Sequence, residues 1–76
     1  MFNLNSLYLN LNKWDEGGVI NNININTLKN IITINCEGPE YYIYKIYINI
    51  FDWLGNNNYI ISVKNYNNII IEPINN

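Results

Sequence analysis

The sequence predicts an all-β protein, with about six short antiparallel strands in a small meander, barrel or compact sandwich and at most one short helix. Three observations support this class. Apolar and polar residues alternate along much of the chain, which is typical of half-buried strands. Clusters of Gly, Pro, Asn and Asp interrupt the alternation about every ten residues, where turns are expected. The 19 Asn and 16 Ile residues often alternate in register, which favours folded strands with an Asn-lined solvent face over a disordered chain.

The expected strands follow one another between short turns. They cover residues 7–12, 19–27, 31–36, 41–51, 59–64 and 69–71. The clearest turn lies at residues 37–40, where Gly38 and Pro39 are adjacent. Residues 26–32 allow two interpretations, because Asn26 and Thr27 resemble a helix N-cap. We favour a tight turn near Lys29 followed by a strand, with one or two turns of helix as the alternative.

A single domain spanning residues 1–76 is expected from the length of the chain. A chain this short buries only about 60% of the surface that its unfolded form exposes. The sequence shows no linker and no convincing internal repeat. A large cofactor cleft beside a self-sufficient core is therefore not expected, and function should lie on the surface.

The charge of the chain is low and slightly acidic. Four Lys and no Arg stand against six acidic residues, giving a net charge of −2. Asn and Lys share A/T-rich codons, so an A/T-rich genome explains the Asn content but not the scarcity of Lys. Because phosphate binding depends on Lys and Arg, a nucleic-acid partner is not expected. The same deficit argues against docking on an anionic membrane.

No group suited to catalysis or metal binding is recognisable. The chain has no His and one cysteine, Cys36, which excludes a four-ligand zinc site within it. Ser6 and Ser62 have no base nearby in the sequence. We therefore expect no enzymatic activity and no cofactor. Cys36 itself is expected to be a buried small hydrophobic residue, with an intermolecular disulfide or a reactive thiol as the alternative.

The expected compartment is inferred from the lack of a visible signal peptide in the first residues and of a long apolar run. No basic n-region and apolar h-region of a signal peptide is visible, and the apolar runs are only a few residues long, far short of a membrane span. A cytoplasmic location is expected, in the host cell if the source is a virus or a mobile element.

The candidate partner-binding site is the expected strand at residues 41–51, which is apolar or aromatic on both faces. A strand of this kind is normally covered on both sides, which a chain of this size cannot easily achieve. Either the sheet curls to shield the second face, or that face binds a partner. Its residues are Tyr41, Ile43, Tyr47 and Phe51. Trp14 and Trp53, in expected loops, either extend this patch or cap the ends of a small core.

These residues favour a small non-enzymatic protein-binding module. We expect an accessory inhibitor or antagonist, of the phage anti-defence or immunity type, that acts by surface occlusion. One alternative is a small-barrel protein that binds single-stranded nucleic acid by stacking bases on Tyr41 and Tyr47 beside Lys45. Another is a structural subunit that uses the same face in a homodimer or larger assembly.

Overall fold

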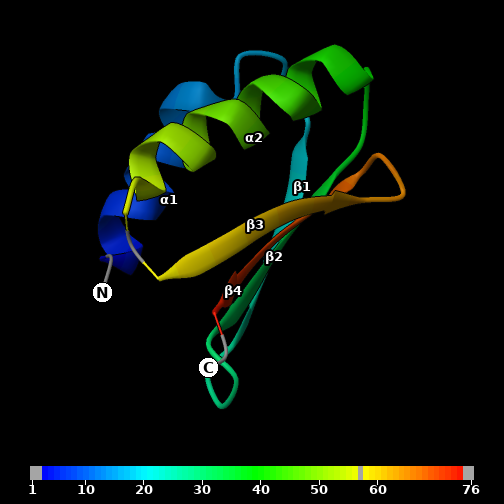
Figure 1. The fold of residues 1–76 in the computed structure, drawn as a ribbon. Helices are drawn as coiled ribbons and strands as arrows, with labels where there is room; N and C mark the ends of the chain where they lie inside the picture. Colours follow the sequence, from blue (N-terminus) through cyan, green and yellow to red (C-terminus); the bar gives the residue numbers. More distant parts are fainter. Residues whose placement is uncertain (1–2, 57, 75–76) are drawn as a thin grey trace.

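The computed structural model describes residues 3–56 and 58–74 of the chain. Two helices and four strands follow one another in the order α-β-β-α-β-β (Figure 1). They are α1 (Leu4–Trp14), β1 (Ile20–Asn26), β2 (Ile31–Cys36), α2 (Glu40–Leu54), β3 (Tyr59–Lys64) and β4 (Asn68–Pro73). The strands form one antiparallel sheet in the order β1-β2-β4-β3. Both helices lie on one face of it, so the fold is two-layer α+β and the all-β prediction is wrong.

Four of the six predicted strands are confirmed. The strands expected at residues 19–27, 31–36, 59–64 and 69–71 are present as β1, β2, β3 and β4. The tight turn near Lys29 is also confirmed, and Asn30 has a φ of 57° at its end. Residues 27–30 form this turn, so the helix considered for residues 26–32 is absent.

The strand predicted at residues 7–12 is instead the middle of helix α1. Leu7, Leu9 and Leu11 alternate in sequence, but the structure buries Leu7 and Leu11 and leaves Leu9 71% exposed. The spacing of four that joins the buried pair is helical. Asn3 caps the helix, since its side-chain oxygen accepts hydrogen bonds from the backbone N–H groups of Asn5 and Ser6, at 2.8 and 3.4 Å.

The strand predicted at residues 41–51 is helix α2, and this is the larger correction. Almost every residue there is Ile, Tyr or Phe, so the segment is apolar at a period of two and at a period of 3.6. The buried residues follow the helical period: Ile43, Ile46, Ile50 and Leu54. The β-propensity of Ile and Tyr is a weak preference that burial of one helical face overrides. Pro39 precedes the first turn, and Gly55, with a φ of 55°, ends the helix.

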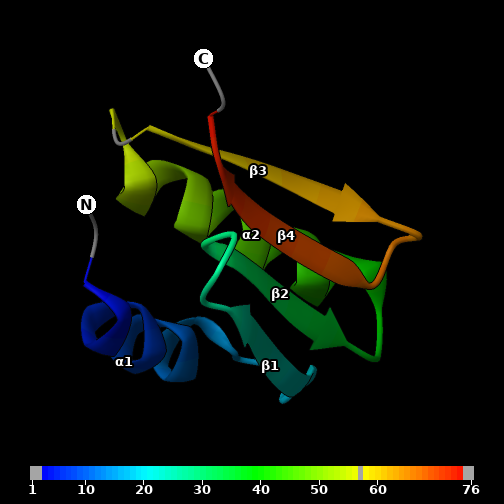
Figure 2. The same cartoon turned by 90° about the horizontal axis from the view of Figure 1, so that it is seen from below.

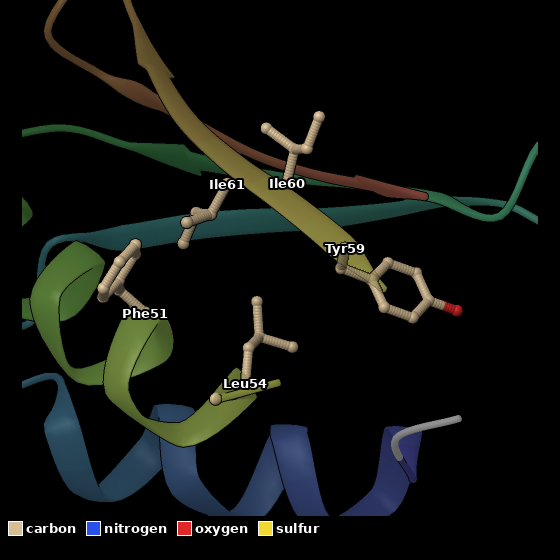
Figure 3. A pocket seen from close by; sticks show the side chains of 6 residues that line it. Phe51, Leu54, Tyr59, Ile60 and Ile61 are labelled. Carbon is tan, nitrogen blue, oxygen red and sulfur yellow. The ribbon is translucent and has the colours of Figure 1, made fainter. Parts of the chain in front are cut away.

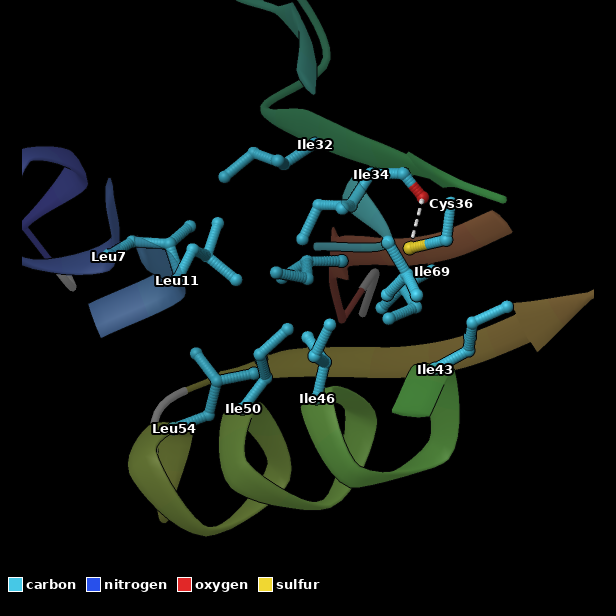
Figure 4. Close-up of a cluster of buried hydrophobic side chains, with 12 residues drawn as sticks. Leu7, Leu11, Ile32, Ile34, Cys36, Ile43, Ile46, Ile50, Leu54 and Ile69 are labelled. Atoms are coloured by element: carbon cyan, nitrogen blue, oxygen red, sulfur yellow. Dashed lines mark hydrogen bonds between the residues drawn. The ribbon is translucent and has the colours of Figure 1, made fainter. Parts of the chain in front are cut away.

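One hydrophobic core lies between the sheet and the two helices (Figure 4). Each element contributes to it through the side chains on one face. The buried residues are Leu7, Leu11, Val19, Ile32, Ile34, Cys36, Ile43, Ile46, Ile50, Leu54, Ile69 and Ile71. Seen from below, α1 lies toward the β1 side and α2 passes behind the sheet toward β3 (Figure 2).

On the opposite face of the sheet the described residues form no helix, and the side chains there are largely polar. Asn24 donates from its side-chain amide to Asn35 at 3.1 Å, and Asn35 donates to Asn68 at 2.6 Å. This row of amides crosses three strands, β1, β2 and β4. The expectation that Asn lines the solvent face of the sheet is therefore confirmed for these strands.

The two halves of the chain repeat the same unit, although the sequence analysis found no convincing internal repeat. Each half is a helix followed by a hairpin, α1-β1-β2 and then α2-β3-β4. The central strands β2 and β4 pair antiparallel, with β1 and β3 at the edges, which is the order that a two-fold axis between β2 and β4 produces. The sequences agree with this symmetry: residues 7–14 read LYLNLNKW and residues 46–53 read IYINIFDW.

Candidate binding surface

The outward side of α2 exposes four large apolar or aromatic side chains, here called the outer stripe. Its members are Tyr41, Tyr44, Ile48 and Phe51, which are 66, 37, 54 and 59% exposed. Steps of three and four residues place all four on one side of the helix. The stripe contains no charged residue, and side chains of this kind dominate the energetics of protein interfaces.

Three rings run along the flank of α2 and form an aromatic row. The ring centroids of Tyr44 and Tyr47 lie 6.1 Å apart with an interplanar angle of 77°, and those of Tyr47 and Phe51 lie 6.4 Å apart at 38°. Tyr47 is half-buried against the core, whereas Phe51 is mostly exposed. The row therefore connects the hydrophobic core to the outer stripe.

A groove lies beside the row, between the end of α2 and the start of β3 (Figure 3). Its volume is about 230 Å³, and it is lined by Phe51, Leu54, Gly55, Tyr59, Ile60 and Ile61. Figure 3 shows Phe51 and Ile61 on the same side of β3, with Ile60 pointing away from the helix. Because β3 is an edge strand, the groove opens at the side of the molecule.

The structure separates the six candidate residues, which are the four of the predicted face and the two tryptophans. Tyr41 and Phe51 are exposed on α2, as a binding surface requires, and Tyr47 is half-buried beside Phe51. Ile43 is 1% exposed and belongs to the core. Its placement on a shared outer face was wrong, because that face was defined by the two-residue period of a strand.

The two tryptophans meet each other and lie away from the outer stripe. The ring centroids of Trp14 and Trp53 are 6.3 Å apart at 69°, an edge-to-face contact between α1 and α2. Both rings are half-buried against the core. Of the two interpretations of these residues, the structure supports their role at the edge of a small core.

Sequence reasoning missed Tyr44 and Ile48, which the structure places on the outer stripe. Under a period of two they fell on the face opposite to Tyr41 and Phe51. The signal that identifies them is the spacing of three and seven residues from Tyr41, which becomes informative once the segment is known to be a helix.

Comparison of the two halves shows that two of the four stripe residues, Tyr44 and Phe51, are particular to the second half. In the alignment of residues 7–14 with 46–53, Leu9 corresponds to Ile48 and Asn12 to Phe51. One turn earlier, Asn5 corresponds to Tyr44. At these two positions aromatic side chains stand on α2 where the related helix α1 carries Asn, so the shared α-β-β unit does not require aromatic residues there.

The positive charge nearest to the stripe is already paired. Lys45 Nζ lies 2.7 Å from Glu16 Oε2 and 5.5 Å from the centroid of the Tyr41 ring. The hydrogen bond to Glu16 raises the pKa of Lys45, so the amine stays charged. The other three lysines are far apart in the chain: Lys13 lies in the last turn of α1, Lys29 in the turn between β1 and β2, and Lys64 at the end of β3. This distribution provides no continuous basic surface beside the aromatic row.

The single cysteine is poorly suited to chemistry. Cys36 is 3% exposed, and burial, with a smaller contribution from the Asp15 carboxylate, raises the pKa of its thiol to about 11. The reactive form of cysteine is the thiolate, which this environment disfavours. Within residues 3–56 and 58–74, no three His, Cys, Asp or Glu side chains are grouped closely enough to hold a metal ion.

Neither α1 nor α2 has the length and the apolar character that a membrane span requires, and no other helix is present in the described residues. In comparisons with known proteins, no protein-family model, no curated protein and no solved structure matches the chain.

Proposed function

We propose that this chain is a non-enzymatic protein-binding module that occludes a surface of a partner protein through the outer stripe of α2. The observation that carries the proposal is the outer stripe itself. Its four large uncharged side chains are mostly exposed, and the opposite side of the same helix is buried in the core. Tyr and Phe bury much area with few rotatable bonds, so a stripe of these residues binds a partner at low cost in side-chain entropy. An accessory inhibitor or antagonist needs only such a surface.

The comparison of the two halves supports this proposal. If the apolar stripe followed only from the composition of the chain, α1 would be expected to carry one too. Instead Asn5 and Asn12 stand where α2 has Tyr44 and Phe51. Both of these changes from Asn to an aromatic residue lie at exposed positions, where side chains contribute little to folding.

A nucleic-acid-binding role is less well supported. The chain is not a barrel, and the open face of the sheet presents the Asn24, Asn35 and Asn68 row where a stacking surface needs rings. The rings lie on the flank of a helix instead, and the nearest amine, Lys45, is paired with Glu16.

The test uses the first half of the chain as the source of the substitutions. The variant Tyr44→Asn/Phe51→Asn gives α2 the residues found at the related positions of α1. Leu9→Asn is the matched control, because it removes an exposed apolar residue from α1 at the position related to Ile48. Circular dichroism should show all three proteins folded. Tagged proteins are incubated with lysate of the source or host cell, and bound proteins are quantified by mass spectrometry.

We expect at least one protein to be recovered with the original chain and with Leu9→Asn, and about tenfold less with the double variant, as for the loss of hot-spot residues. Equal recovery by the double variant contradicts the proposal. Sedimentation at several concentrations is measured in parallel. A dimer that dissociates in the double variant supports the structural-subunit alternative instead.

A further inference from the structure

The edge strand β3 has backbone N–H and C=O groups that form no hydrogen bonds to another strand in the described part of the chain. Ile74 N donates to Asn58 O at 3.0 Å, just beyond the last pair of the β3–β4 ladder. Antiparallel pairs alternate between hydrogen-bonded and non-hydrogen-bonded, so the even-numbered residues of β3 hold the bonds to β4. The peptide groups of Ile61 and Val63 then point to the opposite side, where no strand lies in the described part of the chain.

The other edge of the sheet is less open to pairing. In β1 the register with β2 shifts between Ile20 and Asn22, and a bulge of this kind hinders the addition of another strand. The Asp15 carboxylate also binds the start of this edge, accepting hydrogen bonds from Val19 N at 2.7 Å and Ile20 N at 3.2 Å. The pairing of β3 with β4 is regular over all six residues.

The groove beside β3 suits a side chain on an added strand. A neighbouring strand lies about 4.8 Å from β3 and points every second side chain to the helix side. Ile61 points to that side, because it pairs with the buried Ile71, and it lines the groove together with Phe51. At about 230 Å³, the groove is smaller than the roughly 300–1,000 Å³ of ordinary ligand pockets. It has the size for one large apolar side chain.

We propose that β3 binds an extended segment of the partner protein as a fifth strand, with an apolar side chain of that segment seated in the groove beside Phe51. Strand addition of this kind takes its affinity from main-chain hydrogen bonds and its specificity from pockets for alternate side chains. The segment has large apolar residues at alternate positions on the helix side. On the open side it carries polar residues, with an acidic one opposite Lys64. This inference rests on the proposed function, which it makes more specific.

Two other occupants fit the geometry less well. A partner helix could pack on the outer stripe, but its backbone groups are bonded internally and leave those of Ile61 and Val63 unpaired. A second copy pairing β3 with β3 would present its own Ile61 and Val63, which already pack on the core of that copy. The groove would then stay empty.

The probe is a displayed library of random twelve-residue peptides, selected on the full chain. We expect the selected peptides to share alternating apolar residues. In amide hydrogen exchange by NMR, a bound peptide should slow exchange of the Ile61 and Val63 amides about tenfold or more. N-methylation of the peptide at the strand-facing amides should weaken binding by a similar factor.

Val63→Pro is the variant that blocks the edge, because it removes an amide that points away from β4. We expect it to abolish peptide binding, whereas Leu9→Asn leaves binding unchanged. The N-methyl peptides give the same information on the unaltered protein if Val63→Pro fails to fold.

Three outcomes overturn the inference about β3. They are selected peptides with helical spacing, binding that survives both backbone changes, and selection of no peptide. The proposed function stands in each case if the variant Tyr44→Asn/Phe51→Asn still fails to recover the partner. Concentration-dependent protection of Ile61 and Val63 without peptide also overturns it, in favour of a second copy. If the double variant keeps the partner but Val63→Pro loses it, the proposed function fails instead.

Discussion

Trp14 and Trp53 occupy the same position in the two halves of the chain, and their rings contact each other edge to face at 6.3 Å. Each is near the end of its helix, so the pair joins α1 to α2 where the two helices meet. The contact lies on the opposite flank of α2 from the aromatic row. One flank of α2 therefore packs against α1 through the tryptophans, whereas the other flank borders the groove.

The tryptophan contact should be measurable as a coupling energy. We expect Trp14→Leu and Trp53→Leu to destabilise the fold less in combination than the sum of their separate effects, by about 0.5–1.5 kcal/mol. Urea unfolding followed by circular dichroism measures each free energy of unfolding. A cycle between Trp14→Leu and Ile60→Ala, on opposite sides of the sheet, is the control and should be additive. Additivity in the tryptophan cycle would contradict a specific ring contact.

Gly17 is required by the ring of Tyr42. A Cβ at position 17 would lie 2.7 Å from Cγ and 2.9 Å from Cδ2 of that ring, closer than real contacts allow. Gly17→Ala is therefore expected to reduce the free energy of unfolding by about 1–3 kcal/mol. In a Tyr42→Ala background the same substitution should cost much less. An equal cost in both backgrounds would show that the ring is not the cause.

Tyr66 stands in a turn where glycine is better suited. Asn65 and Tyr66 have φ values of 55° and 63°, and Asn67 N donates to Lys64 O at 3.2 Å, as in a type I′ turn, which prefers Asn-Gly. Tyr66 is 63% exposed and so gains little from packing. We expect Tyr66→Gly to stabilise the protein by about 0.5–1 kcal/mol in thermal unfolding. Asn67→Gly, where φ is not positive, should instead destabilise it.

The thiol of Cys36 makes stability depend on pH in the alkaline range. Its pKa is about 11 in the folded protein, against an ordinary value of 9.0, chiefly because burial disfavours the thiolate. The unfolded chain therefore releases this proton first. The contribution to stability is fully present below pH 9 and is lost as the pH rises to 11, with a total on the order of 2 kcal/mol.

Cys36→Ala provides the comparison, because Tyr and Lys residues also titrate above pH 9 in both proteins. The difference in free energy of unfolding between the original chain and this variant should be constant up to pH 9 and change between pH 9 and 11. A difference independent of pH would show that the folded protein does not hold the thiol proton. Iodoacetamide should also label native Cys36 far more slowly than the urea-unfolded chain at pH 8.

The sequence predicted the elements whose patterns were unambiguous. The strands at residues 20–26, 31–36, 59–64 and 68–73 were found because polar residues alternate with apolar ones or turn residues bound short β-branched runs. The helices were missed because Leu7, Leu9 and Leu11 alternate as in a strand, and residues 41–51 are apolar at nearly every position. A pattern without polar residues does not distinguish the two periods.

The candidate site was predicted in part for the same reason. Tyr41 and Phe51 were grouped by the two-residue period of an expected strand, and a spacing of ten residues also leaves both exposed on the outward side of α2. Tyr44 and Ile48 required the helical period, and Ile43 was misplaced by the period of a strand. The free edge of β3 was not predictable, since strand order depends on which hairpin edges meet in the folded chain.

By itself, the sequence determined what depends on composition and local pattern. These features are an Asn-lined solvent face, a turn at Lys29, four short strands and a surface poor in positive charge. Tertiary structure alone decided which face of residues 41–51 is buried. The sheet offers one apolar face to cover, and only as a helix can this segment place Ile43, Ile46 and Ile50 on it together. That choice turned Tyr44, Ile48 and Phe51 outward and placed Phe51 at the groove beside β3.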